Sequence, residues 1–193
     1  MVSALRAVLP LICAVSLFGQ SQPGIQQQAP GMMTPWEIAP VLDEIGAHGG
    51  RLREALAHVD VKAWVEKGAS ETYLQQWQSS SEQARAVADS AKLLARSPEK
   101  LSAGLELLFR MQALGVMLGS LEEGMRHYQK PADAQQLAAL AGEIAPDRER
   151  FERYLVGLAQ GQEQQIAVMD KEAQRCRGMI TAPAPPSRTG KKN

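Results

Sequence analysis

Apolar residues recur along most of the chain at alternating spacings of three and four, which is the pattern of amphipathic α-helices. The first such stretch follows Thr34-Pro35-Trp36-Glu37, which combines an N-cap residue, a proline suited to the first helical position and the glutamate of a capping box. We predict a first helix that begins at residue 35 or, because of Pro40, at residue 40, and that runs to about residue 65. Gly49-Gly50 is a place where this helix can bend, and Gly68 is its natural end. Its apolar stripe contains Ile38, Leu42, Ile45, Leu52, Leu56 and Val59.

Two further helices are predicted between residues 70 and 128. The second runs from Ser70 to about Arg96, and its narrow, alanine-rich face favours a short distance to a neighbouring helix. The third follows Ser97-Pro98-Glu99 and has the widest apolar stripe, so we expect it to be the most buried. Gly115 and Gly119 on this third helix are predicted to pack against the alanine-rich second helix. Charged residues at 106 and 110 interrupt its apolar run, which argues against a membrane span.

A fourth helix is predicted to begin at Pro131 and to end at Gly178, with a kink or a split at Pro146. Its stripe contains Leu137, Ala141, Ile144, Phe151, Leu155, Leu158, Ile166, Met169, Ala173 and Cys176. Four long helices with short connections predict an all-α protein over residues 35–178: an antiparallel four-helix bundle, up-down-up-down, with coiled-coil-like seams.

The first 21 residues have the order of a secretory signal peptide. Arg6 precedes a twelve-residue apolar run from Ala7 to Phe18, and the small residues Gly19 and Ser21 follow. Twelve helical residues span about 18 Å, which is too short for a hydrocarbon core of ~30 Å. We therefore predict an exported protein, periplasmic or secreted, with cleavage after residue 19 or 21. Residues 22–34 are rich in Gln, Pro and Gly and are predicted to be a flexible linker.

Charge is balanced overall but not along the chain. There are 21 Lys+Arg and 21 Asp+Glu, which excludes a globally basic nucleic-acid binder. Residues 175–193 nevertheless contain five basic residues and no acidic one. We predict that residues 179–193, which are also Pro-rich, form a disordered basic tail. Aromatic residues make up only 5% of the chain, which disfavours an all-β fold.

The three histidines each follow a glutamate by four residues, as Glu44/His48, Glu54/His58 and Glu123/His127. Such a pair can bind one metal from a single helix face, but on a solvated face it only supports the helix. His48 alone flanks the predicted core face. Glu44 and His48 are therefore the residues we would assign to a metal, although we predict no metal and no cofactor. Motifs for covalent heme, a nucleophilic serine or a phosphate loop are absent from the sequence.

Two other features leave alternatives open. Cys176, the single cysteine after residue 21, lies on the apolar stripe between Arg175 and Arg177. It is either a small buried hydrophobe or a reactive thiol available for an intermolecular disulfide. Trp64, Tyr73 and Trp77 bracket the turn at Gly68, and they form either a plug at one end of the bundle or an aromatic patch for a partner.

No set of residues with catalytic spacing remains once the predicted core is assigned. We therefore predict that the protein is not an enzyme but an exported binding or structural module. Its partner would be an unknown protein or a second copy of the chain. In the second case the chain would be a self-associating coiled coil, with the apolar stripes of its helices facing other chains. The alternative is a bundle that binds a metal or another small ligand. We expect neither a nucleic-acid partner nor a membrane span after removal of the signal peptide.

Overall fold

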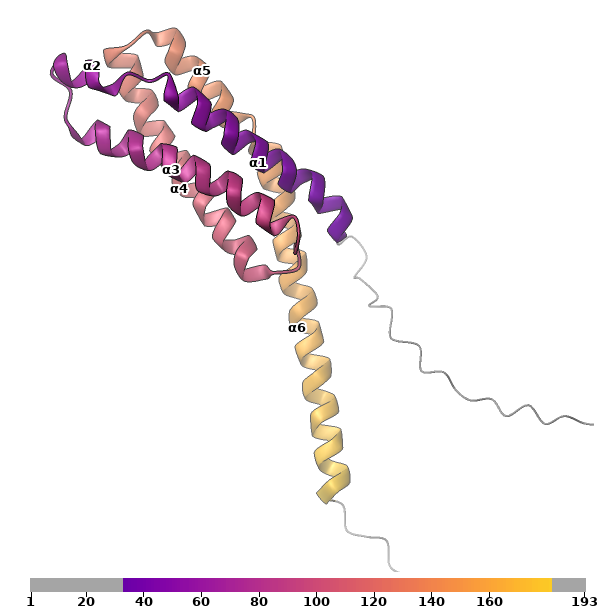
Figure 1. The fold of residues 1–193 in the computed structure, drawn as a ribbon. Helices are drawn as coiled ribbons and strands as arrows, with labels where there is room; N and C mark the ends of the chain where they lie inside the picture. Colours follow the sequence, from indigo (N-terminus) through magenta and orange to yellow (C-terminus); the bar gives the residue numbers. More distant parts are fainter. Residues whose placement is uncertain (1–32, 182–193) are drawn as a thin grey trace, which may run out of the picture.

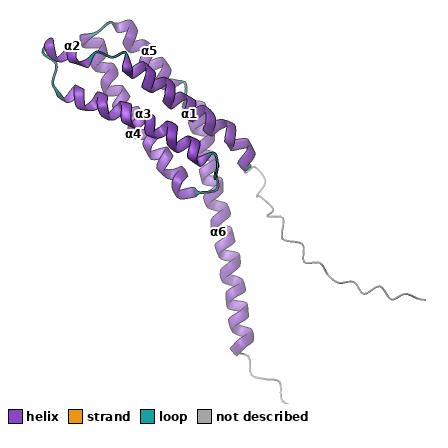
Figure 2. Ribbon diagram, in the orientation of Figure 1, coloured by secondary structure: helices purple, strands orange, loops and turns teal. Residues whose placement is uncertain are grey.

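A computed structural model describes residues 33–181 and places them in helices joined by short connections, with no strand in this range (Figures 1 and 2). The all-helical prediction is confirmed. The predicted signal peptide, most of the predicted linker and the tail beyond residue 181 lie outside the described residues. The helices are α1 (Pro35–Ala57), α2 (Val61–Glu66), α3 (Thr72–Leu94), α4 (Leu101–Tyr128), α5 (Pro131–Gly142) and α6 (Ala145–Thr181).

The helices lie side by side in a helical body, by which we mean residues 35–162 (Figure 1). α1 packs on α3, α3 packs on α4, and α4 packs on α5. The first part of α6 contacts both α1 and α4, and α2 contacts α3. The remainder of α6 extends away from the body as a single helix.

The predicted first helix is two helices in the structure. α1 begins at Pro35, where the Glu37 carboxylate accepts a hydrogen bond of 2.6 Å from the Thr34 backbone N–H. Hydrogen bonds from Thr34 also hold the pKa of Glu37 below its ordinary value. α1 continues through Pro40 and Gly49-Gly50 but ends at Ala57. The prediction of one helix to residue 65 is therefore wrong, because Asp60 caps the separate helix α2 by accepting from the Ala63 N–H at 3.1 Å.

The predicted fourth helix is divided before Pro146, as the sequence indicated. α5 ends at Gly142, α6 begins at Ala145, and Pro146 occupies an early position of α6 where its missing N–H costs nothing. Gly178, however, does not end α6, which continues to Thr181. The predicted boundary between bundle and tail at residue 178 is therefore wrong. A glycine costs a helix interior only about 1 kcal/mol relative to alanine, which is too little to end a helix by itself.

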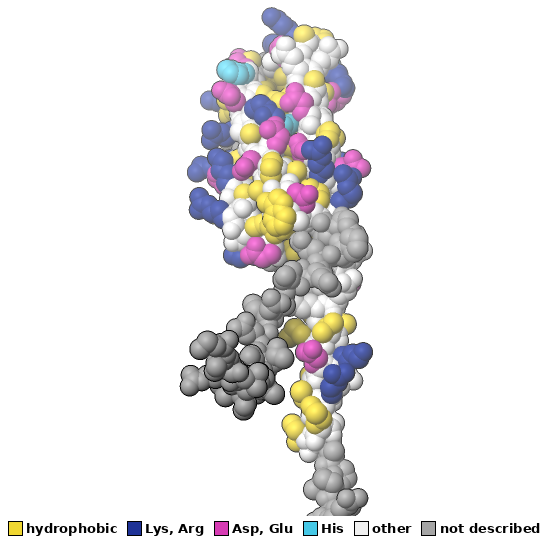
Figure 3. Space-filling view, turned by 90° about the vertical axis from the view of Figure 1, so that its right-hand side faces the viewer, with side chains coloured by type: hydrophobic (Ala, Val, Ile, Leu, Met, Phe, Trp, Pro, Cys, Tyr) yellow, Lys and Arg dark blue, Asp and Glu magenta, His cyan; other side chains and the backbone are white. Residues whose placement is uncertain are grey.

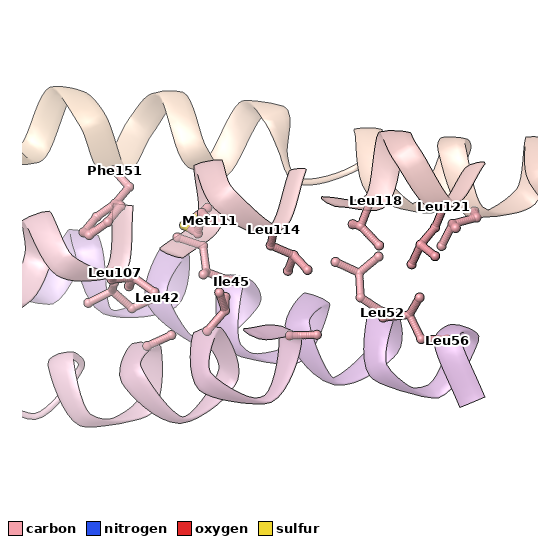
Figure 4. Packing of buried hydrophobic residues seen from close by; sticks show 14 of the residues in the cluster. Leu42, Ile45, Leu52, Leu56, Leu107, Met111, Leu114, Leu118, Leu121 and Phe151 are labelled. Atoms are coloured by element: carbon pink, nitrogen blue, oxygen red, sulfur yellow. The ribbon is translucent and has the colours of Figure 1, made fainter. Parts of the chain in front are cut away.

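The core is formed by side chains of α1, α3, α4, α5 and α6 that meet between the helices, and Figure 4 shows part of it. The narrow part of the stripe predicted for the third helix is buried on α4, from Leu107 to Met125. The prediction that a wide stripe makes this the most buried helix is wrong, because Leu105, Phe109 and Val116 are exposed. Phe151 of α6 is fully buried in this core, and Tyr154 and Leu155 are buried one turn further along the helix. The buried residues that Figure 4 labels are Leu42, Ile45, Leu52, Leu56, Leu107, Met111, Leu114, Leu118, Leu121 and Phe151.

The glycine that meets the backbone of the alanine-rich helix α3 is not one of the predicted pair. A Cβ on Gly49 of α1 would lie 2.9 Å from the Ala84 carbonyl oxygen and 3.2 Å from the Ala88 Cβ, both on α3. Gly115 and Gly119 of α4 are exposed, and a Cβ on either would have no neighbour within 4 Å. The prediction that Gly115 and Gly119 pack against the alanine-rich helix is wrong. α1, not α4, supplies the glycine that lets the backbone approach α3.

Among the described residues, α4 alone is long and apolar enough, by length and composition, to cross a membrane. The same length and composition occur in core helices, and Leu107, Leu114 and Leu121 of α4 are buried in the helical body. Phe109 and Val116 lie on the outer side of α4 and are exposed.

Candidate functional site

His48 lies inside the helical body and has no polar partner. It is 3% exposed, and neither ring nitrogen has a hydrogen-bond partner within residues 33–181. It borders a cavity of about 40 Å³ whose other lining residues come from α1, α3, α4, α5 and the α5–α6 connection. Burial is the main cause that lowers the pKa of His48, and the nearby Arg51 charge acts in the same direction. His48 is therefore held neutral in an apolar setting.

Glu44, the other metal candidate, is turned toward a different partner. Its carboxylate lies 2.8 Å from the Arg51 guanidinium, and Arg51 also lies 3.7 Å from the carboxylate of Glu143. Within the described part of the chain, no three His, Cys, Asp or Glu side chains lie close enough together to hold a metal ion. The structure thus places His48 in the core and Glu44 at the surface, with no third ligand from residues 33–181.

The other two histidines lie at the surface near helix ends. His58 follows α1 and, with Trp77, lines a shallow surface hollow of about 280 Å³ between α1, α2 and α3. The His127 ring meets the Tyr128 ring edge-on at 4.6 Å. The glutamate before His127 is engaged elsewhere, because Glu123 lies 3.0 Å from the Arg126 guanidinium.

The predicted aromatic cluster exists in part: Trp64 and Tyr73 meet, Tyr128 joins them, and Trp77 does not belong to it. Trp64 is buried, with its ring edge-on to Tyr73 at 5.7 Å and stacked on Tyr128 at 6.3 Å. Gly124 lies directly beneath these rings, since a Cβ there would be 2.9 Å from both Trp64 and Tyr73. Trp77 stands apart and donates a 2.8 Å hydrogen bond to the Leu56 carbonyl. Buried Trp64 and the two half-buried tyrosines connect α2 to α3 and α4.

Ile166, Val168, Met169, Met179 and Ile180 are exposed on the projecting segment, by which we mean residues 163–180 of α6. Every residue in this segment is exposed, and Figure 3 shows hydrophobic side chains along it below the helical body. Ile166 is 66% exposed, Met169 is 61% exposed and Ile180 is 82% exposed. The prediction that the stripe from Ile166 to Cys176 belongs to the core is therefore wrong.

Cys176 is accordingly not the small buried hydrophobe that its position on the stripe suggested. Its thiol is free and exposed on the projecting segment. This position is compatible with the other interpretation, an intermolecular disulfide, which stays a prediction. Comparison of gel mobility with and without reductant tests it.

The sequence held a signal for the projecting segment that the periodicity did not show. α6 has 37 residues and follows the 12-residue α5, whereas α3 has 23 residues and α4 has 28. A helical column that much longer than its neighbours must extend beyond them. The stripe is also interrupted between Leu158 and Ile166, where Gln162 occupies the apolar position. This polar interruption coincides with the end of contact with the helical body.

The comparisons with known proteins add no relative. No protein-family model, no curated protein and no solved structure matches this chain.

Proposed function

We propose that the chain is an exported, non-catalytic binding or structural module, and that the projecting segment carries its interaction surface. The observation behind this proposal is a row of exposed residues along one side of the projecting segment, which we call the seam: Ile166, Met169, Ala173, Cys176 and Ile180. No other described part of the chain covers it. Uncovered apolar surface of this kind marks interaction sites in soluble proteins. A groove that accepts one face of an amphipathic helix is a common mode of recognition.

Site-specific photo-crosslinking in the exporting cell tests the proposed surface. A photoreactive amino acid replaces Met169 on the seam in the full-length chain, and Lys171, on the opposite side of the same helix, serves as the matched control position. We expect a discrete protein adduct from position 169 and none from position 171. Absence of an adduct at 169, or the same adducts from both positions, would contradict the proposal.

Export and the arrangement of the helices belong to the same proposal. The mature chain would begin at Gln20 or Gln22, which mass spectrometry of the protein recovered outside the cytoplasm measures directly. Recovery of the chain with its first residues intact would argue against a cleaved signal peptide. We also propose that α5 and the first half of α6 form one column of an up-down-up-down bundle with α1, α3 and α4. The residues after Thr181 would then be the basic tail.

A second candidate function, binding of a small ligand, is favoured by the unpartnered ring nitrogens of buried His48. The adjoining cavity of about 40 Å³ is far smaller than the pockets of roughly 300–1,000 Å³ that hold cofactor-sized molecules. A ligand there would be a small, mostly apolar molecule with one polar atom. Melting scans with Zn(II), Cu(II) and heme, together with elemental analysis of untagged protein, test the wider metal or cofactor alternative. Unchanged melting and no bound element would remove that alternative.

A further inference from the structure

The seam of the projecting segment continues the face by which α6 packs on the helical body. The seam residues are separated by three or four positions and are Ile166, Met169, Ala173, Cys176 and Ile180. An α-helix turns about 100° per residue, so the seam lies on the same side of α6 as Phe151 and Leu155. Both of those residues are buried in the helical body. The body therefore overhangs one end of the seam, and any occupant of the seam must fit beneath it.

We propose that the occupant is the projecting segment of a second copy of this chain, paired antiparallel about a two-fold axis. The inference rests on the proposed function and names the partner. In a parallel pair, each helical body would lie on the side of α6 that faces the other helix. The two bodies would then occupy the same space. In an antiparallel pair, the bodies lie at opposite ends and the seams can meet between them.

The charges beside the seam fit the antiparallel direction. Glu163, Asp170 and Arg177 are seven residues apart and therefore line one flank of the seam. In antiparallel pairing the same flank of each helix meets, so the acidic end of one copy faces the basic end of the other. One register sets Met169 opposite Ile180 of the second copy and Ala173 opposite Cys176 of the second copy. In this register Asp170 lies beside Arg177 of the second copy, and the two-fold axis repeats that pair.

The two flanking groups can take part in this pair while keeping contacts in their own chains. Asp170 accepts a 2.8 Å hydrogen bond from the Gln174 side chain, and its carboxylate retains further acceptor sites. Arg177 also has interactions within its own chain. A guanidinium has five N–H donors and can bind a carboxylate in addition.

The size of the seam predicts a reversible dimer. Residues 169–180 span about 18 Å of helix. A pair of helices in contact over this length should bury less surface than the ~1,200 Å² or more that stable interfaces bury. The dimer population should therefore rise with protein concentration, and a local excess of the chain would promote pairing.

Sedimentation equilibrium of the full-length mature chain and of two glutamate variants tests the seam. Met169→Glu places a charge in the seam, whereas Val168→Glu places the same charge on the same helix outside it. We expect the unmodified chain and Val168→Glu to dimerise similarly, and Met169→Glu to associate at least about tenfold more weakly. Circular dichroism confirms that both variants fold. A chain that stays monomeric at every concentration, or equal association of the two variants, overturns the proposal.

Charge exchange tests the direction and the register. Asp170→Arg and Arg177→Asp should each weaken association, because each sets like charges beside one another across the two-fold axis. The double variant Asp170→Arg/Arg177→Asp should restore association to that of the unmodified chain. In a parallel pair, Glu172 would instead lie next to residue 177 of the other copy. The double variant has an aspartate at position 177, so two carboxylates would meet and association would remain weak. Failure of the double variant to recover therefore overturns antiparallel pairing.

The crosslinking experiment at position 169 separates this inference from the proposed function. An adduct with twice the mass of the chain supports self-pairing. An adduct with a different protein or with lipid overturns the second-copy proposal, although the different protein would leave the proposed function standing. No adduct at position 169 counts against both.

Discussion

Two adjacent glycines in α1 meet different surroundings. Gly49 faces α3, where a Cβ would lie 2.9 Å from the Ala84 carbonyl oxygen and 3.1 Å from the Ala88 backbone nitrogen. Gly50 faces open space, with no atom within 4 Å of a Cβ built there. Because backbone atoms cannot yield as a flexible side chain does, position 49 sets how closely α1 approaches α3.

Gly49→Ala should be less stable than Gly50→Ala by about 1–3 kcal/mol, the usual cost of overpacking. Both changes gain helix propensity, by up to ~1 kcal/mol, so Gly50→Ala should match or exceed the unmodified chain in stability. Urea unfolding followed by circular dichroism gives both free energies of unfolding. Equal stability of the two variants would show that α1 and α3 are not held by this contact.

Buried His48 makes the stability of the helical body depend on pH. Burial lowers its pKa in the folded chain, whereas the unfolded chain takes up the proton near pH 6.5. The unfolded state therefore binds more protons as the pH falls, and stability decreases below about pH 6.5. Arg51 acts with burial to lower the pKa, while Glu143, Glu44 and Asp147 oppose it.

His48→Leu should reduce the loss of unfolding free energy between pH 7.5 and pH 5.5. The leucine has no proton to take up and suits the apolar surroundings of the cavity. His58→Leu, at an exposed position after α1, is the matched control and should keep the full pH dependence. Urea unfolding at the two pH values measures the difference. An unchanged pH dependence in His48→Leu would assign the effect to other groups.

At the scale of elements, apolar periodicity predicted where long helices lie better than where they end. The break between α1 and α2 was missed because Val59 within it is buried, as are Leu56 before it and Val61 after it. The apolar pattern therefore continues across residues that are not helical. Asp60, a residue typical of N-caps, was the local signal for the break.

Periodicity also explains why the candidate surface was predicted as core. A stripe such as Ile166, Met169 and Ala173 shows which side of a helix is apolar, but it carries no information about what covers that side. The same limit applies to His48, whose place on the core face was predicted while its lack of a hydrogen-bond partner was not. Both properties depend on residues distant in sequence, which only the packed helices bring near.

Trp64 is the residue that packs the six-residue helix α2 onto the rest of the helical body. Trp64→Ala should cost about 3–5 kcal/mol of unfolding free energy, because it removes a buried ring that contacts Tyr73 and Tyr128. Trp36→Ala is the matched control, since Trp36 is 73% exposed and should change stability by less than about 0.5 kcal/mol. Denaturant unfolding followed by circular dichroism compares the two. A small effect of Trp64→Ala would show that α2 does not contribute to the core.

At the scale of the whole molecule, the helical body and the projecting segment should open independently. The body is held by a shared core, whereas the projecting segment lacks the tertiary packing from which most helical stability in proteins comes. Limited trypsin digestion should therefore cut first, among residues 33–181, at Lys171, Arg175 or Arg177. Mass spectrometry of the time course identifies these sites. If the seam pairs with a second copy, the cuts should slow as protein concentration rises, and a first cut within α3 or α4 would contradict this division.

One uninterrupted helix joins the buried ring of Phe151 to the exposed side chains near Ile180. The packed half of α6 thus provides a ready-made nucleus for the exposed half, and a binding partner meets a helix whose costly first turn already exists. A partner that binds only the helical form of the far end would in turn stabilise that form, by an amount that grows with its free concentration.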